Sequence, residues 1–369
     1  MARRSRRSSP AVAHSRVAGH DGRVHLAVVA EQLRAPVPGG TGRYTTELIS
    51  ALTAGAQIGD RITQWQAPVI GRMGRYGRPV LAELWRRGVG PAPRHADVVF
   101  SPTPLAPPRQ GRPLIVTIHD AVPWTHPETL TPRGARWHRE IAVRIARDAD
   151  VVLTPTHAVA VALREHLPLR RVEVIGEGVN AELLVVPADA EARAQRLQLP
   201  AAYALAVGTL EPRKGLDIAA AALKEPSWPA DLPLVVVGPD GWGGVSLPAG
   251  IEVLGRLGDR DLATVYSRAS VLVMPSRAEG FGLPVLEAMA HGLPVVISDA
   301  PALVEISGGA AVVVPRENAA ALAHGVARAL TERAELSAAG LIRSRAFSWD
   351  ASAAQLWDIC RALLSTESR

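Results

Sequence analysis

Residues 274–299 read MPSRAEGFGLPVLEAMAHGLPVVISD, which is an apolar run, a glycine-rich loop, a helix-like segment and a second apolar run. The first run ends at Pro275, the loop contains Glu279 and residues 280–282, and the helix-like segment contains Glu287. Glycines at a helix start let a ligand approach bare backbone N–H groups, which suits phosphate. Carboxylates repel phosphate but accept hydrogen bonds from hydroxyl groups. Glycines and carboxylates together therefore indicate a sugar-nucleotide site.

The length and composition are those of a globular protein with two domains. The chain has 369 residues, of which 47% are hydrophobic, 21% charged and only 4% aromatic, so Ala, Val and Leu must form most of the core. The single cysteine, Cys360, excludes an intramolecular disulfide and a cysteine-based metal cluster, and we expect it to be packed in the terminal helix. No apolar run approaches the roughly 20 residues that cross a bilayer. The N-terminus, MARRSRRSSPAVAHS, lacks the apolar segment of a secretory signal, so a cytoplasmic protein is expected.

The charge balance favours anionic partners. The net charge is +6 and the sequence pI is about 10.2. Four arginines lie within residues 3–7, and we expect residues 1–22 to form a disordered basic tail. The alternative is a weak electrostatic contact with anionic membrane, which would place the protein peripherally at the inner face of the plasma membrane. Nucleic-acid binding is not expected, because the basic residues are dispersed, aromatics are scarce and no recognition motif is present.

Apolar runs that suit buried strands alternate with helix-like segments along the chain. The expected strands of a first series are at 24–30, 97–100, 114–118, 150–154 and 172–175. Those of a second series are at 203–207, 234–237, 251–254, 271–274, 294–297 and 311–314. The expected helices are at 43–52, 81–87, 132–147, 157–166, 215–223, 261–269, 283–291, 319–330 and 349–364. Repeated strand–helix units predict an α/β fold with two doubly wound parallel sheets.

The composition changes to Ala, Arg, Gln and Pro at residues 187–200, and we place the linker between the two sheets there. Residues 65–95 are rich in Gly, Pro and Arg, so we expect a mobile loop there besides the short helix. Two facing sheets would form an interdomain cleft between the carboxyl ends of their strands, where ligands of open α/β sheets bind.

Two cations stand where a helix is expected to begin. Arg213 and Lys214 follow the strand at 203–207, although a helix N-terminus prefers acids. An anionic ligand would resolve this conflict, and a diphosphate between the two cations and the amides of residues 280–283 would fit. An ordinary solvated Arg-Lys pair is the alternative.

Three weaker patterns remain. Gly39 to Gly42 (GGTG) could form a loop that presents amides to a phosphate, or a plain turn. His119, at the end of a strand, could bind a sugar hydroxyl or transfer a proton, or simply bond to backbone. Two D-x-D pairs, at 148–150 and 259–261, match a short metal motif of some sugar transferases. Both have positions typical of structural aspartates, so no metal site is expected.

Taken together, these segments resemble the retaining family-4 glycosyltransferases of the GT-B fold, from about residue 24 to residue 364. The most specific part is the pair Glu279 and Glu287 within GFGLPVLEAMAHGLPVV. The other parts are GGTGRY at 39–44, VTIHD at 116–120, VGTLEPRKGLD at 207–217 and the segment 347–349.

The resemblance implies a division of the chain. After the tail, residues 23–190 would form an N-terminal Rossmann-like domain on the acceptor side. Residues 191–345 would form a C-terminal Rossmann-like domain that binds the nucleotide sugar. Residues 346–369 would form a helix that crosses back to the N-terminal domain.

The resemblance also implies roles for the motif residues. Glu279 would contact the hydroxyls of the transferred sugar, Glu287 the ribose, and His119 the donor sugar near the reacting carbon. Arg213 and Lys214 would stabilise the diphosphate as it leaves. Further donor contacts would come from Gly40, Gly42, Arg256, Leu257, Gly280, Phe281, Gly282 and Leu283.

The implied activity is transfer of a hexose with retention of configuration, without a metal or a cofactor other than the nucleotide sugar. The versions HDAVPWTHPE and VGTLEPRKGLD resemble bacterial mannosyltransferases that use GDP-mannose, which would serve polysaccharide biosynthesis. Donor alternatives are dTDP-rhamnose, a UDP-sugar or GDP-fucose, and the acceptor would be a glycan or a lipid-linked acceptor. Functions of another class are a GT-B-fold epimerase, a phosphorylase-like enzyme or a non-catalytic nucleotide-binding protein.

Overall fold

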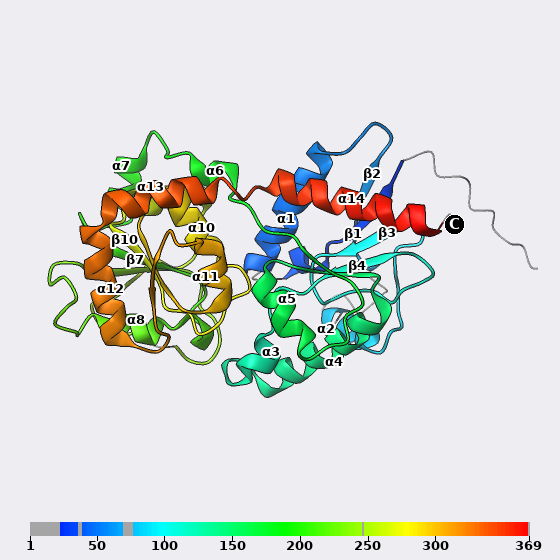
Figure 1. The fold of residues 1–369 in the computed structure, drawn as a ribbon, viewed down its shortest axis with the longest axis horizontal. Coiled ribbons are helices and arrows are strands. Elements are labelled where there is room, and N and C mark those ends of the chain that lie inside the picture. The colour runs from blue at the N-terminus through cyan, green and yellow to red at the C-terminus, as the bar shows by residue number, and fades with distance from the viewer. Residues whose placement is uncertain (1–22, 36–38, 69–76, 246, 368–369) are drawn as a thin grey trace, which may run out of the picture.

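The computed structural model describes residues 23–35, 39–68, 77–245 and 247–367, which form two α/β halves side by side (Figure 1). The basic tail expected at residues 1–22 lies outside the described residues, as do residues 69–76 of the expected mobile loop. Among the residues described, no helix combines the length and apolar character needed to cross a membrane.

The first half contains a six-stranded sheet in the order β2-β1-β3-β4-β5-β6, and every strand pair is parallel. Its inner strands are short runs such as VVFS, LIVT and VVLT, which are buried along their whole length because helices cover both faces. The strands are β1 (His25–Val29), β2 (Arg61–Trp65), β3 (Val98–Ser101), β4 (Leu114–Thr117), β5 (Val151–Thr154) and β6 (Val172–Val174).

Helices pack on both faces of this first sheet. One apolar cluster joins the sheet to α1 and α14, and another joins the opposite face to α2, α4 and α5. The helices of this half are η1 (Glu31–Arg34), α1 (Gly39–Ala54), α2 (Gly77–Arg86), α3 (Val122–Thr125), η3 (Pro127–Thr129), α4 (Pro132–Asp148) and α5 (His157–Arg164).

The second half contains a six-stranded parallel sheet in the order β12-β11-β10-β7-β8-β9. Counted from β9, this is the 3-2-1-4-5-6 order of a dinucleotide-binding fold, so the strand order reverses between β7 and β10. The strands are β7 (Ala204–Val207), β8 (Leu234–Val237), β9 (Glu252–Val253), β10 (Val271–Met274), β11 (Val295–Ser298) and β12 (Val312–Val314).

The helices of the second half also cover both faces of their sheet. Apolar side chains of α9 and α10 pack on one face, and those of α8 and α12 on the other. The helices are α6 (Ala181–Leu184), α7 (Ala190–Arg196), η4 (Pro212–Lys214), α8 (Leu216–Ala222), α9 (Asp259–Arg268), α10 (Leu283–Ala290), α11 (Pro301–Ser307), α12 (Ala319–Thr331) and α13 (Arg333–Ser344).

The last helix, α14 (Trp349–Glu367), returns from the second half to the first (Figure 1). It packs against α1, and the Trp357 indole donates a hydrogen bond of 3.2 Å to the Leu52 carbonyl. Cys360 is buried in the same cluster, and burial raises the pKa of its thiol to about 12. The thiol therefore stays protonated and acts as a packing residue.

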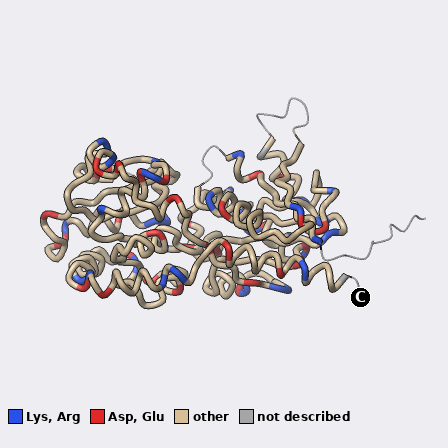
Figure 2. The backbone as a smooth tube through the Cα atoms, turned by 90° about the horizontal axis from the view of Figure 1, so that it is seen from above, with Lys and Arg blue, Asp and Glu red and all other residues tan. Residues whose placement is uncertain are grey.

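Several elements differ from the sequence-based expectations. The edge strand β2, RITQW, was not predicted, because it is polar and only partly buried and so lacks an apolar run. The glycines at 39–42 do not form a loop but the first turn of α1. The predicted linker at 187–200 contains α7, and α11 and α13 were not predicted. Among the residues described, basic and acidic positions are interspersed over both halves (Figure 2).

Candidate active site

The two sheets meet at the carboxyl ends of their strands. Gly280, in the loop after β10, lies so close to the backbone of His119, after β4, that an added Cβ would be 2.0 Å from the His119 carbonyl oxygen. The Thr156 hydroxyl, after β5, donates a hydrogen bond of 3.0 Å to the Gly280 carbonyl. Only glycine at position 280 allows the two backbones to come this close. The close contact brings the motifs of both halves together at one place.

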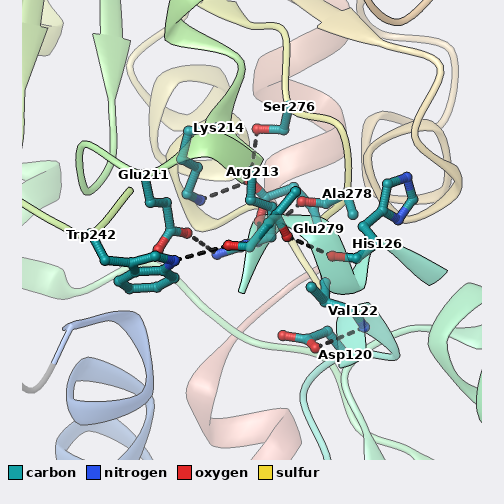
Figure 3. A network of polar contacts seen from close by, with 11 residues as sticks. Asp120, Val122, His126, Glu211, Arg213, Lys214, Trp242, Ser276, Ala278 and Glu279 are labelled. Atoms are coloured by element: carbon teal, nitrogen blue, oxygen red, sulfur yellow. Dashed lines mark hydrogen bonds and ion pairs between the residues drawn. The ribbon is translucent and has the colours of Figure 1, made fainter. Parts of the chain in front are cut away.

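Arg213, Lys214 and Glu279 form the centre of this contact (Figure 3). Lys214 Nζ lies 2.7 Å from Glu279 Oε1, and Arg213 Nη1 lies 2.9 Å from Glu279 Oε2. The cations follow β7 and the acid follows β10, which are the strands on either side of the point where the strand order reverses. The structure therefore brings these three predicted residues together where open α/β sheets bind ligands.

The charged centre is buried and tightly bonded. Glu279 also accepts a hydrogen bond of 2.8 Å from the Ser276 hydroxyl, and Arg213 bonds to Glu211 at 2.6 Å. Burial alone would raise the pKa of Glu279, but Lys214 and Arg213 outweigh it and lower the pKa to about 2. Glu279 is therefore a carboxylate at every physiological pH, able to accept hydrogen bonds but not to donate a proton.

The local fold fixes the two cations. They do not begin a helix, as the sequence predicted, but lie in the short 3-10 turn η4. Gly215 ends this turn in the left-handed region at φ 65°, and an added Cβ there would meet the Pro275 carbonyl at 2.1 Å. The Arg213 carbonyl accepts a hydrogen bond of 2.8 Å from the amide of Arg277. The β7 and β10 loops are thus bonded into one unit.

His119 faces the same contact from the first half. Its Nε2 lies 2.8 Å from the Pro102 carbonyl oxygen, and its Nδ1 lies 3.8 Å from Glu177 Oε1. The Tyr44 ring packs edge-on against the imidazole at 4.7 Å. Burial alone would lower the pKa of His119, but Glu177 and the Pro102 carbonyl raise it above its usual value. Both ring nitrogens thus lie near acceptor oxygens, which stabilise the protonated form relative to a free imidazole.

Glu287 lies on α10 and is buried. Its Oε2 accepts a hydrogen bond of 2.7 Å from the Tyr266 hydroxyl of α9. Its Oε1 accepts one of 3.1 Å from Arg43, which belongs to α1 of the first half. Burial raises the pKa of Glu287, and Arg43 partly opposes this effect.

The remaining predicted donor-binding residues differ in how they are placed. Gly282 caps α10 in the left-handed region and Leu283 begins the helix, so backbone amides are available there. The Phe281 side chain is buried against Phe347 and can offer a ligand only its backbone. Gly40 and Gly42 lie in the first turn of α1. Arg256 and Leu257 lie just before α9, whose first residue bonds to Arg43, so they are on the Glu287 side of the contact.

The D-x-D pairs are both engaged in protein contacts. Asp148 bonds to Arg147, and Asp150 accepts from the Leu114 amide and from Arg109. The second pair bonds to arginines as well, namely Arg43, Arg193 and Arg196. Among the described residues, no three His, Cys, Asp or Glu side chains come together as metal ligands.

A hollow of about 930 Å³ lies on the first-half side of the contact. Its lining includes Gln32 after β1 and Thr103 after β3, the strands between which the order of the first sheet reverses. Thr103 follows Pro102, whose carbonyl bonds to His119. The hollow therefore adjoins His119, one of the predicted site residues. Helices α2 and α4 complete its walls with arginines, glutamates and Trp137.

Several site residues escaped sequence analysis. Glu177 and Tyr266 had no motif to mark them, because each acts through a partner on another segment. Glu211 stands in the quoted motif VGTLEPRKGLD, two residues before its partner Arg213, but was given no role. Arg43 stands in the quoted motif GGTGRY, but its partner is 244 residues away. Trp242, which donates a hydrogen bond of 2.9 Å to the Thr129 carbonyl across the two halves (Figure 3), had only its glycine-rich setting as a signal.

Comparisons with known proteins find relatives for both halves of the chain. Residues 60–183 match the family model "Glycosyltransferase Family 4", and residues 201–332 match "Glycosyl transferases group 1". An O-antigen chain mannosyltransferase B of Escherichia coli is 27% identical over 87% of this chain and 95% of that protein. A D-inositol 3-phosphate glycosyltransferase of Streptosporangium roseum is 31% identical over 69% of this chain and 65% of that protein. Sucrose-phosphate synthase of Thermosynechococcus elongatus superposes with a TM-score of 0.72 over 93% of this chain and 99% of that one, at 23% identity.

Two six-stranded parallel sheets with flanking helices, together with the superposed structure, identify the fold as GT-B. Within this class, the chain belongs to the family-4 glycosyltransferases. It is therefore an enzyme of the hexosyltransferase type.

Proposed function

We propose that this enzyme transfers mannose from GDP-mannose, with retention of configuration, to a glycan or lipid-linked acceptor. The observation that carries the proposal is the buried unit of Glu279, Arg213 and Lys214 at the reversal point of the second sheet. A carboxylate for sugar hydroxyls is held there beside two cations for the diphosphate.

In the proposed reaction, the bond between the anomeric carbon and the β-phosphate oxygen breaks. Arg213 and Lys214 stabilise the negative charge that develops on the leaving diphosphate. The acceptor hydroxyl attacks from the same face of the sugar, and its proton passes to the leaving phosphate oxygen. Glu279 and His119 orient the sugar by hydrogen bonds, and backbone amides of residues 280–283 bind the phosphate.

The hollow of about 930 Å³ is the proposed acceptor site. It lies at the reversal point of the first sheet and adjoins the Pro102–His119 contact. Helix α2 contributes part of its wall. A saccharide end would fill such a volume.

The choice of mannose follows the sequence motifs and is supported by the mannosyltransferase relative, whose alignment extends over 95% of that protein. The D-inositol 3-phosphate glycosyltransferase relative is not named for a donor sugar, so the donor alternatives dTDP-rhamnose, a UDP-sugar and GDP-fucose stay open. The reaction is proposed to need no metal or further cofactor, and the protein is proposed to act in the cytoplasm of a bacterium, with peripheral contact to anionic membrane.

A thermal-shift screen tests the donor. GDP, UDP, dTDP and ADP and their sugar conjugates are added to the full chain, and the ligand that binds the folded state raises Tm according to its affinity. We expect GDP and GDP-mannose to give the largest shifts. A larger shift with another nucleotide reassigns the donor, and no shift with any of them contradicts the nucleotide-sugar function.

A product assay separates the competing classes. Proton NMR of the product formed from GDP-mannose and an acceptor glycan would show an α-anomer for a retaining transferase. Conversion of the nucleotide sugar to its epimer without acceptor would indicate the epimerase. Binding without turnover would indicate a non-catalytic protein.

A further inference from the structure

Arg43 joins the two halves through a carboxylate of the proposed donor site. One arm of its guanidinium donates to Glu287 Oε1 at 3.1 Å, and the other donates to Asp259 Oδ1. Arg43 lies on α1 of the first half, whereas Glu287 and Asp259 lie on α10 and α9 of the second. Its side chain is only 24% exposed, so the contact is largely shielded from water.

The ion pair belongs to a wider network at the same place. Asn180, in the segment between the sheets, donates to Asp259 Oδ2 at 3.0 Å and to Glu47 of α1 at 2.9 Å. Tyr266 donates to the second oxygen of Glu287 at 2.7 Å. These bonds fix both the position and the plane of the Glu287 carboxylate.

The carboxylate retains the capacity to bind a ligand. Two oxygens offer about four acceptor positions, and protein donors fill one on each oxygen. One acceptor position therefore remains on each oxygen, which matches the two adjacent hydroxyls of a ribose. A protonated Glu287 would lose one of these positions, because its O–H would be a donor.

The charges that face Glu287 come from several elements. Among the main influences on the pKa of Glu287, Arg43 of α1 is the cation, and the acids are Asp259 of α9 and Glu177 after β6. Tyr266 of α9 is neutral, because burial and Glu287 raise the pKa of its hydroxyl well above the usual value. Arg43 therefore opposes burial and two like charges in keeping Glu287 ionised.

We propose that Arg43 is a positioning residue for the donor nucleotide: it is the counter-ion that holds Glu287 as an ionised, oriented acceptor for the two ribose hydroxyls. The inference rests on the proposed function, because it deepens the role of Glu287 there. Because Arg43 belongs to the first half and Glu287 to the second, the ribose site is complete only when the two halves are in contact. Binding of the nucleotide and contact between the halves are thereby coupled.

The test measures binding of GDP, UDP and ADP by calorimetry and compares wild type with Arg43→Met. Methionine keeps the length of the side chain and removes its charge and its donors. Each nucleotide is also used as its 2′,3′-dideoxy form, which lacks the hydroxyls that Glu287 would bind. Arg361→Met is the matched control: Arg361 is 26% exposed and pairs at 2.7 Å with Asp60, on a distant segment of the first half.

We expect Arg43→Met to weaken binding of the preferred ribonucleotide by about tenfold or more at pH 7.5. The dideoxy form should bind the variant and wild type within about twofold, and Arg361→Met should bind both forms like wild type. Loss of Arg43 raises the pKa of Glu287 further, so ribonucleotide binding should fall off with acidification at a higher pH than in wild type.

The role of Arg43 would be overturned if Arg43→Met lost equal affinity for the ribose and the dideoxy forms. It would also be overturned if the variant bound the ribonucleotide with the Kd of wild type. If Arg43→Met does not fold, Arg43→Lys takes its place, because it keeps the charge but reaches only one carboxylate. The affinity of that variant should fall by about threefold for the ribonucleotide and stay unchanged for the dideoxy form. If wild type binds none of the three nucleotides, the proposed function itself fails, and the inference fails with it.

Discussion

Lys214 Nζ and Glu279 Oε1 lie 2.7 Å apart, which joins the loops that follow β7 and β10 by a buried ion pair. Both side chains are largely removed from water, with exposed fractions of 14% for Lys214 and 6% for Glu279. The cation proposed for the diphosphate and the acid proposed for the sugar thus neutralise each other. Their bond holds both side chains in place at the contact, and fixed groups lower the cost of positioning a substrate.

Removal of the Lys214 amine should impair turnover more than folding. In Lys214→Ala, Glu279 still bonds to Arg213 and Ser276, so the carboxylate keeps two of its three partners. The leaving diphosphate, however, loses one of its two preplaced cations. We expect kcat to fall by at least about tenfold, or roughly 1.4 kcal/mol of barrier.

Steady-state kinetics with the donor identified by the screen measure this effect, and thermal unfolding reports on the fold. Lys224→Ala is a suitable control, because Lys224 follows α8 rather than the charged centre. Turnover of Lys214→Ala like that of wild type, with the fold intact, would argue against a catalytic cation at this position.

Chelation of divalent metals should leave activity unchanged. The carboxylates of both D-x-D pairs are bonded to arginines or to a backbone amide, and a metal would have to replace those partners. The measurement is turnover before and after dialysis against EDTA. A loss of activity that Mn²⁺ restores would show that one of these pairs binds a metal during the reaction.

Much of the fold follows from the sequence, because inner strands of a parallel sheet are buried on both faces and appear as continuous apolar runs. This explains why β3, β4, β5, β8 and β10 were predicted within about a residue of their observed bounds. Edge strand β2 has one unpaired side and polar residues, so no such run exists. The short helix α11 begins with Pro301, a usable signal that was overlooked.

Site residues could be predicted where they stand together in a short sequence motif. They could not be predicted where the bonding partners come from distant segments. Glu279, Arg213 and Lys214 stand in recognisable motifs, and the structure brings them together. The contact of Arg43 with Glu287 depends on how two sheets dock, which no local spacing encodes. The same holds for Glu177 and His119, which are far apart in sequence and lie side by side only in the folded chain.

The low pKa of Glu279 predicts a specific acid sensitivity. Its folded-state pKa of about 2 lies below the ordinary value of 4.5, so its ionised form stabilises the folded state above pH 4.5. This contribution is lost as the pH falls from 4.5 towards 2. Because Glu279→Gln cannot titrate, its difference from wild type in the free energy of unfolding should shrink by roughly 1 kcal/mol between pH 5.5 and 3.5.

Urea unfolding at the two pH values measures this difference. Acid effects of all other carboxylates are common to both proteins and cancel in the comparison. A constant difference between wild type and Glu279→Gln would mean that the pKa of Glu279 is the same in the folded and the unfolded protein, so that Lys214 and Arg213 do not lower it.

Gly280→Ala should separate the two halves without unfolding either one. The added methyl would lie 2.0 Å from the His119 carbonyl oxygen, and both are backbone positions that cannot rotate away. The halves must therefore move apart, which breaks the bond from Thr156 to the Gly280 carbonyl and moves His119 away from Glu279. We expect turnover to fall by about 100-fold or more, because misplacement of a catalytic group by about 1 Å lowers the rate by that much.

Gly77→Ala is the control: an added methyl there meets nothing within 4 Å, so this variant should behave like wild type. Near-normal turnover of Gly280→Ala would show that the reaction does not require the close contact between His119 and Gly280, and the catalytic geometry would then have to be sought in a more open arrangement of the halves.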